Sequence, residues 1–378
     1  MIFFHLSDLH IGKRVNKKSL LEEQKHILDV IVHAAEDRKP DGILIAGDVY
    51  DLTIPAAEAV ALFDDFLVRL QSLGIKVFVI SGNHDSPERI AFASRIMNRS
   101  GVYMSPVYAG ETTPIVLSDV FGEVAIYMLP FVKPATVRYW AGDDSIKTYD
   151  DAVRYAVGKM EVDPSRRNII IAHQLITNAE RSDSEEVSVG GVENVDASVF
   201  DAFDYVALGH LHRPQSCTRK TVRYSGSPLK YSFSEVKDKK GIVVVELGKK
   251  GDVQLDTSPL EPLHDWHDLR GTYDELTAKS FWDGTPYRED FVRVTLTDEE
   301  DIPDALGKLR AVYHNLMELQ YDNKRTRSGM TTVGGAEKVH EKTPQELFSE
   351  LYEKQNGQPM SDDQEAFLKG LVESIWED

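Results

Sequence analysis

Several short apolar runs between residues 1 and 212 each end directly at aspartate, asparagine or histidine side chains. The runs are rich in β-branched residues and alternate with segments of helical period, which is the pattern of an α/β domain. The expected strands are Ile2–Ser7, Gly42–Ala46, Lys76–Ser81, Val124–Leu129, Asn168–Ala172 and Tyr205–Leu208. Apolar residues at helical spacing from Leu20 to Val32 and from Ala59 to Leu70 predict two helices that cover the sheet.

The polar side chains that follow these strands form one chemical set. They are Asp8, His10, Asp48, Asp51, Asn83, His84, Asp85, His173, His210 and His212. Because ligands bind at the carboxyl ends of the strands in an open α/β sheet, we expect these groups to converge in one crevice. Carboxylates, an amide oxygen and imidazoles, without sulfur, suit Mn²⁺, Fe²⁺ or Zn²⁺, and Mn²⁺ fits the hard donors best.

The donors outnumber what one ion needs, and a carboxylate such as that of Asp48 can bridge two ions. The sequence therefore predicts a binuclear centre that activates water for attack on phosphorus. Any one of these residues taken alone is as easily explained as a helix cap or a surface residue. The shared position after successive strands is what favours a metal site.

The overall charge limits the kinds of partner. A formal net charge of −19 argues against a simple electrostatic binder of nucleic acid. It does not exclude a nuclease, because divalent cations reverse the local charge of a carboxylate-rich cleft and a partner subunit can supply basic surface. The single cysteine, Cys217, excludes an internal disulfide and a thiolate zinc site. No apolar run is long enough to cross a membrane, so we expect a cytoplasmic protein without a membrane partner.

The pattern changes after the first domain, which we expect to span residues 1–261. Residues 262–323 read as strand, turn and helix and predict a small α+β capping domain, and the polar residues 324–343 predict a flexible linker. Residues 344–378 carry two apolar stripes at helical spacing. Simple packing is one explanation of the stripes, and docking to a partner is the other, which the preceding linker favours. The stripes are Leu347, Phe348, Leu351 and Tyr352, then Phe367, Leu368, Leu371, Val372 and Ile375.

The order of the motifs resembles that of a known superfamily. The series D-x-H, G-D-x-x-D, G-N-H-D, H and G-H-x-H, from Asp8 to His212, resembles the calcineurin-like metallophosphoesterase signature. The stretches FDYVALGHLHRPQ and YSGSPLKYSFSE, with the glycine pair of SVGGVENVD, are similar to the bacterial SbcD nuclease family over nearly the whole chain. The resemblance implies an α/β fold, a metallophosphoesterase β-sandwich flanked by helices, with a small α+β cap domain and a C-terminal helical tail.

The same resemblance implies roles for the site residues. Asp8, His10, Asp48 and His212 would hold one metal ion, and Asp48, Asn83, His173 and His210 the other. His84 would be the catalytic histidine at the scissile phosphate, and Asp85 would orient it through the far ring nitrogen. Asp51 belongs to the active site, either behind a ligand or in contact with substrate.

The resemblance also implies an activity and partners. It points to a Mn²⁺-dependent DNA nuclease, a double-strand 3'-to-5' exonuclease and a structure-selective hairpin endonuclease, in DNA repair, recombination and replication. Its partners would be an SbcC-type ATPase, bound through the C-terminal helices, and a second copy of the chain in a homodimer. A small-molecule or cyclic-nucleotide phosphodiesterase is the alternative from the same chemistry. A scaffold for the ATPase is the alternative of another class.

Overall fold

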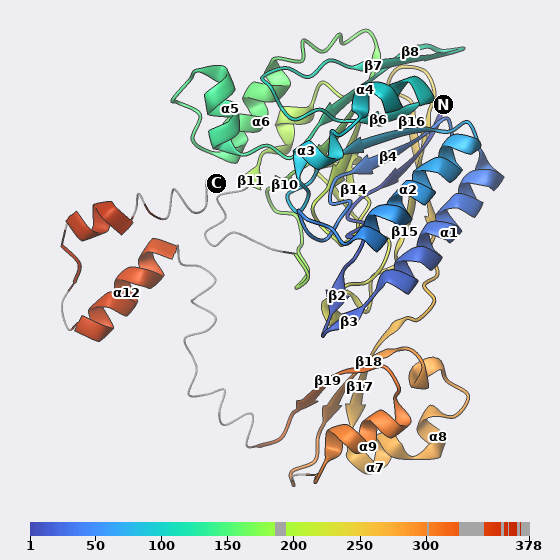
Figure 1. Ribbon diagram of the computed structural model, residues 1–378, viewed down its shortest axis with the longest axis vertical. Helices are drawn as coiled ribbons and strands as arrows, with labels where there is room; N and C mark the ends of the chain where they lie inside the picture. Colours follow the sequence, from blue (N-terminus) through green and yellow to red (C-terminus); the bar gives the residue numbers. More distant parts are fainter. Residues whose placement is uncertain are drawn as a thin grey trace.

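Two six-stranded sheets lie at the centre of the part of the chain that the structure describes (Figure 1). The structure is a computed structural model that describes residues 1–185, 194–300, 302–324, 344–356, 359–361, 363–368 and 371. The first sheet has the order β16 (Val253–Pro259), β15 (Gly241–Leu247), β1 (Ile2–Leu6), β4 (Gly42–Ala46), β5 (Lys76–Ile80) and β6 (Val102–Met104). The second has the order β13 (Gln215–Cys217), β14 (Arg219–Tyr224), β12 (Tyr205–Gly209), β9 (Arg167–His173), β8 (Gly122–Leu129) and β7 (Ile115–Asp119).

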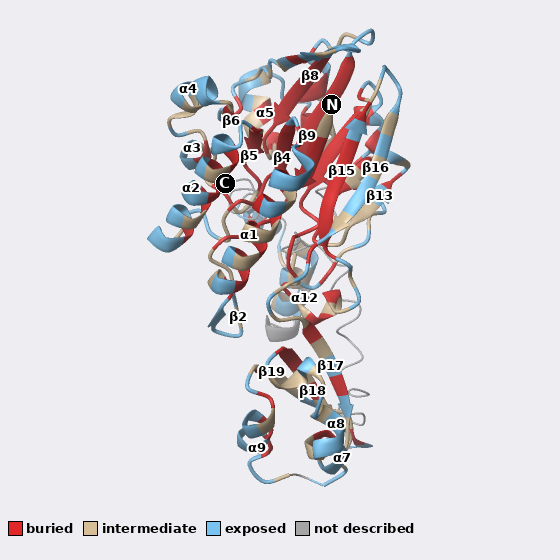
Figure 2. Cartoon of the chain, turned by 90° about the vertical axis from the view of Figure 1, so that its right-hand side faces the viewer, coloured by how far each residue is buried: buried red, intermediate tan, exposed pale blue. Residues whose placement is uncertain are grey.

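Alternating side chains pack these sheets face to face. Phe3, Phe78 and Ile80 of the first sheet share one buried cluster with Ile126 and Ile171 of the second. The opposite face of the first sheet is covered by α1 (Leu21–Arg38) and α2 (Ala57–Ser72), and that of the second by α5 (Pro134–Ala141) and α6 (Tyr149–Gly158). Figure 2 shows the interior strands β15, β9 and β8 buried, whereas the edge strand β16 is largely exposed. The expected β-sandwich flanked by helices is confirmed.

Parallel pairing brings the ends of the central strands to one edge. In the first sheet β1, β4, β5 and β6 run parallel, and in the second β8, β9, β12 and β14 do so. All six predicted strands are present, and their ends differ from the prediction by at most two residues. The polar side chains singled out in the sequence lie at or just after the carboxyl ends of β1, β4, β5, β9 and β12.

Short elements complete this part of the chain. They are β2 (Arg14–Val15), β3 (Lys18–Ser19), α3 (Pro87–Ile90), α4 (Ser94–Met97), β10 (Leu175–Ile176) and β11 (Asn194–Val195). Four 3₁₀ turns accompany the described elements, at Asn98–Ser100, Ala197–Phe200, Phe233–Glu235 and Pro286–Arg288. The glycine pair at residues 190 and 191 lies outside the described residues.

A separate small sheet follows the sandwich. Its parallel strands are β17 (Trp266–Gly271), β18 (Phe291–Leu296) and β19 (Leu316–Tyr321), with α7 (Tyr273–Thr277), α8 (Lys279–Trp282) and α9 (Ala305–Val312) packed around a core of their own. Trp266 and Phe291 join it to the core of the first sheet. The hairpin of β2 and β3 also reaches it, since Asn16 donates a hydrogen bond to the carbonyl of Met317 at 3.1 Å.

The C-terminal part contains α12 (Pro344–Asn356), on which Phe348 and Leu351 are about half exposed. Residues 363–368 are also helical. The expected linker lies outside the described residues except for Lys324, and so do Val372 and Ile375 of the second apolar stripe. In the ranges that the structure covers, no helix combines the length and the apolar character needed to span a bilayer.

Candidate metal centre

The backbone is unusual where the first polar side chains leave the sheets. Asp8, His10 and Asp48 adopt φ angles of 53°, 43° and 49°, and His210 adopts 106°. Side chains other than glycine seldom occupy this region, so the surrounding structure must hold them there. Two backbone hydrogen bonds do so, from Asp8 N to Gly47 O at 3.0 Å and from His10 N to Asp48 O at 2.9 Å. These strained turns aim the side chains into a common space between the two sheets.

One group of donors consists of Asp8, His10 and His212, whose ligand atoms all lie within 4.8 Å of one another. The Nε2 atoms of His10 and His212 face each other at 3.0 Å. All three side chains are buried. Two imidazole nitrogens this close repel each other through their lone pairs unless a proton or another cation lies between them. A metal ion between the two nitrogens would accept both lone pairs.

A second group consists of Asn83, His173 and His210. The Oδ1 atom of Asn83 lies 2.9 Å from Nε2 of His173 and 3.0 Å from Nδ1 of His210. Nδ1 of His173 donates to the carbonyl oxygen of Ala46 at 2.8 Å, so in the neutral ring Nε2 is an acceptor. An acceptor nitrogen that faces an acceptor oxygen likewise requires a cation. Burial lowers the pKa of His173, but Asp48 raises it more strongly, to about 9, whereas burial lowers the pKa of His210 to about 3.

Asp48 lies between the two groups. Its Oδ2 atom is 3.6 Å from Nε2 of His10 and 3.4 Å from Nε2 of His173. Its Oδ1 atom accepts a hydrogen bond from the backbone N–H of His84 at 2.9 Å. Burial raises the pKa of Asp48, but His173 and His10 lower it, and the balance leaves it well below its usual range. An ionised carboxylate with one oxygen facing both groups is able to bridge two ions.

Two glycines permit this close assembly. A Cβ on Gly82 would lie 2.1 Å from Oδ1 of Asp48, and a Cβ on Gly209 would lie 1.8 Å from the carbonyl oxygen of Ala46. Neither position has room for a side chain. The glycines before Asn83 and His210 are therefore part of the construction of the site.

His84 lies beside the first group, with its ring centroid 4.8 Å from that of His10. Its Nδ1 atom is 3.1 Å from the carbonyl oxygen of Asp51. A carbonyl can only accept, so Nδ1 carries the proton and Nε2 is left for another partner. A ring nitrogen of His84 also lies close enough to a ring nitrogen of His10 and a carboxylate oxygen of Asp48 for the three to form a possible metal-binding group.

The expected contact between Asp85 and the ring of His84 is wrong. The Asp85 carboxylate instead accepts hydrogen bonds from the backbone N–H groups of Val49, Tyr50 and Gly82, at 3.1, 2.9 and 2.9 Å. The turn after β4 presents N–H groups that need an acceptor, and the carboxylate next to His84 in sequence turns toward them. Burial, and then Asp48, raises the pKa of Asp85 to about 6. Asp85 thus ties together the turns after β4 and β5.

Asp51 lies behind His10. Its Oδ1 atom is 3.4 Å from Nδ1 of His10 and 2.7 Å from Nζ of Lys13. Of the two positions left open by the sequence, this geometry favours support of a ligand over contact with substrate. Lys13 neutralises the carboxylate from the other side.

Sequence reasoning missed several residues that hold the site in place. Gln24 of α1 donates to the carbonyl of His10 at 2.6 Å, and its Oε1 atom accepts from Gly12 N at 2.9 Å. Tyr231 donates to the carbonyl of Leu9 at 2.6 Å. A polar Gln24 in an otherwise apolar helical stripe was a signal for such a role. Around His212, Ser184 and Lys240 carried no comparable pattern, and Glu235 was marked only as the last residue of the stretch YSGSPLKYSFSE.

Comparison with known proteins gives matches over most of the chain. A family model described as calcineurin-like phosphoesterase matches residues 1–214, and one described as type 5 capsule protein repressor C-terminal domain matches residues 259–356. A protein of Staphylococcus epidermidis, named as the SbcD subunit of nuclease SbcCD, is 32% identical over 382 residues, which cover 99% of each chain. Among solved structures, a dimetal phosphatase from Danio rerio matches with 11% identity and a TM-score of 0.40, over 70% of this chain and 98% of that one.

Proposed function

Because the chain belongs to the calcineurin-like phosphoesterases, and within them to the SbcD nuclease family, we propose that it is a two-metal DNA nuclease that acts with an SbcC-type ATPase. The observation that carries the chemistry is the position of Asp48. One of its carboxylate oxygens faces His10 and His173, which belong to different donor groups. This arrangement suits hydrolysis of a phosphodiester between two cations.

The contacts support a division of the donors between two ions, with Asp8 also within 4.8 Å of the ligand atoms of Asp48 and His173. Asp8, His10, Asp48 and His212 would hold one ion, and Asp48, Asn83, His173 and His210 the other. Oxygen and nitrogen donors without sulfur favour Mn²⁺. When bound, the two cations polarise the phosphoryl oxygens and make the attacking water more acidic.

The remaining residues position the ligands or transfer a proton to the leaving group. Nδ1 of His84 donates a hydrogen bond to the carbonyl of Asp51, which leaves Nε2 available to the scissile phosphate. A proton carried on Nε2 can then pass to the leaving oxygen. Asp51 supports His10, and Asp85 keeps the turns after β4 and β5 in register. The backbone N–H of His84 holds Oδ1 of Asp48, which leaves Oδ2 directed at the two donor groups.

The activity assay compares a duplex DNA, a DNA hairpin and a generic aryl phosphodiester in Mn²⁺. We expect cleavage of the DNA substrates, with 3'-to-5' degradation of duplex ends and opening of the hairpin. Activity confined to the aryl ester would instead identify a small-molecule phosphodiesterase, which the net charge of −19 would suit.

A basic hairpin near the site is a candidate DNA-binding surface on this acidic protein. The β2–β3 hairpin begins just after the first donor group and carries Lys13, Arg14, Lys17 and Lys18. Lys13 is paired with Asp51, and Lys18 lies over the ring of Phe291. The Arg14 and Lys17 side chains are exposed, and Arg14 donates to the carbonyl of Lys17 at 2.6 Å. We propose that these two contact phosphates of the substrate backbone.

Reversing both charges, in Arg14→Glu/Lys17→Glu, should weaken binding of duplex DNA and flatten its salt dependence. Each lost phosphate contact reduces the slope of log affinity against log salt by about 0.9, so a loss of roughly 2 is expected. Binding is measured by fluorescence anisotropy over a salt series, and hydrolysis of the aryl ester should be unchanged. The matched control is Lys220→Glu/Lys249→Glu, because both lysines are exposed and lie at the opposite edge of the sandwich. Equal effects of the two pairs would contradict a specific role for the hairpin.

The C-terminal helices are the proposed docking element for the ATPase. Phe348 and Leu351 on α12, and Phe367 further on, are 49%, 52% and 72% exposed. Apolar side chains on a separate helix at this exposure favour a partner surface. We also propose a homodimer, to which the exposed Leu52, Ile54, Phe92 and Ile96 after the adjacent strands β4 and β5 would contribute.

Deletion of the chain after Lys342 should leave basal nuclease activity in place and abolish co-purification of the ATPase. The sandwich and the small sheet have their own cores, so we expect them to fold without these helices. The matched point variant, Phe348→Ser/Leu351→Ser, should have the same effect on co-purification without shortening the chain. Unchanged recovery of the ATPase with either variant would refute this docking site.

A further inference from the structure

His212 can serve as a ligand only if the proton of its neutral ring is on Nδ1. Its Nε2 atom faces the donor group of Asp8 and His10, so the lone pair must be on Nε2. The partner of Nδ1 is the hydroxyl of Ser184 at 2.6 Å. A hydroxyl can either accept a proton from Nδ1 or donate one to it, so Ser184 by itself does not decide the tautomer.

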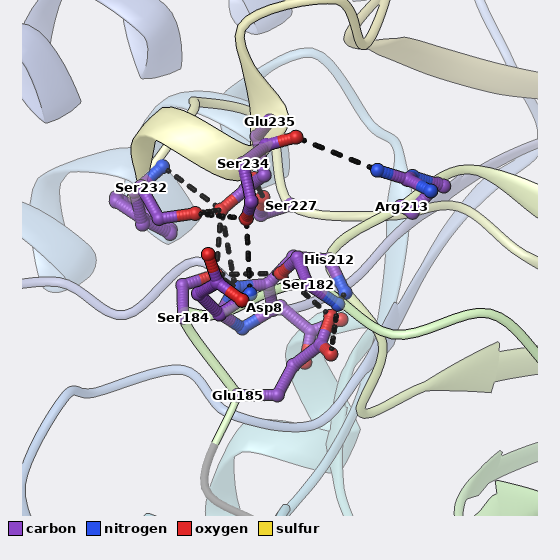
Figure 3. A network of polar contacts seen from close by, with 12 residues as sticks. Asp8, Ser182, Ser184, Glu185, His212, Arg213, Ser227, Ser232, Ser234 and Glu235 are labelled. Atoms are coloured by element: carbon purple, nitrogen blue, oxygen red, sulfur yellow. Dashed lines mark hydrogen bonds and ion pairs between the residues drawn. The ribbon is translucent and has the colours of Figure 1, made fainter. Parts of the chain in front are cut away.

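The neighbour of Ser184 removes this ambiguity. The Ser184 hydroxyl donates to Oε1 of Glu235 at 2.5 Å. An ionised carboxylate can only accept, so it takes the hydroxyl proton and leaves an oxygen lone pair of Ser184 for the N–H of His212. Figure 3 shows Ser184, Glu235 and His212 in this network, with Glu185 beside them.

Lys240 keeps Glu235 ionised. Its Nζ atom donates to Oε2 of Glu235 at 2.6 Å and to the carbonyl of His212 at 2.7 Å. Both Glu235 and Lys240 are buried. A buried ion pair with this many hydrogen bonds fixes a geometry more than it adds stability.

Two of the other ligand histidines are oriented differently. Nδ1 of His173 donates to a backbone carbonyl, that of Ala46, which is always an acceptor. His10 has the carboxylate of Asp51 at 3.4 Å. His212 instead depends on two side chains in series. Ser184 contacts its ring, and Glu235, from the 3₁₀ turn at Phe233–Glu235, contacts Ser184.

We infer that Glu235 is a positioning residue for the first metal ion: through Ser184 it holds His212 in the tautomer that can bind metal. This inference rests on the proposed two-metal function. The backbone of His212 is fixed separately, by Glu185 on its N–H at 2.7 Å and by Ser227 N on its carbonyl at 3.1 Å. Loss of Glu235 should therefore affect the ring more than the chain path.

The test is Mn²⁺ binding by calorimetry and electron paramagnetic resonance on the full chain. Glu235→Gln places an amide beside Ser184, which can donate to the hydroxyl and so turn the hydroxyl proton toward Nδ1 of His212. The wild type should bind two Mn²⁺ and give an exchange-coupled spectrum. Glu235→Gln and Ser184→Ala should each keep one ion with wild-type affinity and bind the other about 10- to 100-fold more weakly, with the six-line spectrum of an isolated ion.

Two further variants separate positioning from folding. Glu235→Gln/Lys240→Met removes the unpaired buried cation that could unfold the single variant, and it should show the same loss at one site. Asp119→Asn breaks another ion pair, with the buried Arg167 at the opposite edge, and should bind both ions normally even if it lowers the melting temperature. Wild-type affinity at both sites in Glu235→Gln and Ser184→Ala would overturn the inference. A wild type that binds fewer than two ions would refute the proposed function itself, and this inference with it.

Discussion

Replacing Asp48 by asparagine should remove the bound metal and the phosphodiesterase activity together. The backbone N–H of His84 requires an acceptor at Oδ1, so the amide oxygen would take that position and the NH₂ group would face His10 and His173. The variant would then present a donor where two cations need a shared anion. Cations at such a site contribute several kcal/mol to the transition state, so activity should fall by roughly 10³-fold or more.

Elemental analysis of the purified variant, paired with hydrolysis rates in Mn²⁺, measures both losses. Asp64→Asn is the matched control, because Asp64 is an exposed aspartate on α2. It should retain metal content and rate. An Asp48→Asn chain that kept two ions per chain would show that this carboxylate does not bridge them.

Replacing His84 by glutamine should abolish most hydrolysis while the metal content stays the same. His84 contacts the carbonyl of Asp51 through Nδ1, and its other nitrogen is the one proposed to act on the leaving oxygen. Glutamine can keep a hydrogen bond but cannot transfer a proton, and loss of a general acid or base typically costs about 10²- to 10⁴-fold in rate.

Single-turnover cleavage of duplex DNA and metal analysis on one preparation test this role. His33→Gln is the control, since His33 is an exposed histidine whose Nδ1 likewise contacts a backbone carbonyl, that of Asp29 at 2.7 Å. Wild-type cleavage by His84→Gln would refute the catalytic assignment. A parallel loss of metal would make His84 a ligand, as its proximity to His10 and Asp48 allows. Wild-type protein without hydrolysis would favour the scaffold hypothesis.

The strand-end motifs were predictable because one general rule relates the order of strands in the sequence to the position of their ends in the fold. Parallel strands in a sheet share a carboxyl edge, so Asp8, Asp48, Asn83, His173 and His210 could be expected together before any contact was known. The periodicity of the apolar residues also located the first residue of α1 and of α2 to within one or two positions. These predictions depend on local pattern and on a general property of sheets.

The contacts behind the ligands were not predictable in this way. Asp85 follows His84 directly, but adjacent residues point in different directions, and the carboxylate turned to the N–H groups of the neighbouring turn. Ser184 and Glu235 meet at His212 because two loops distant in sequence pack together. No periodicity or spacing encodes such a meeting, which depends on the full three-dimensional packing.

Each donor group draws on both sheets of the sandwich: His10 faces His212, and Asn83 faces His173 and His210. Neither half of the sandwich carries a complete donor group, so we expect phosphodiester hydrolysis only after the two sheets have packed together. The catalytic site would thus form late, together with the packing of the two sheets.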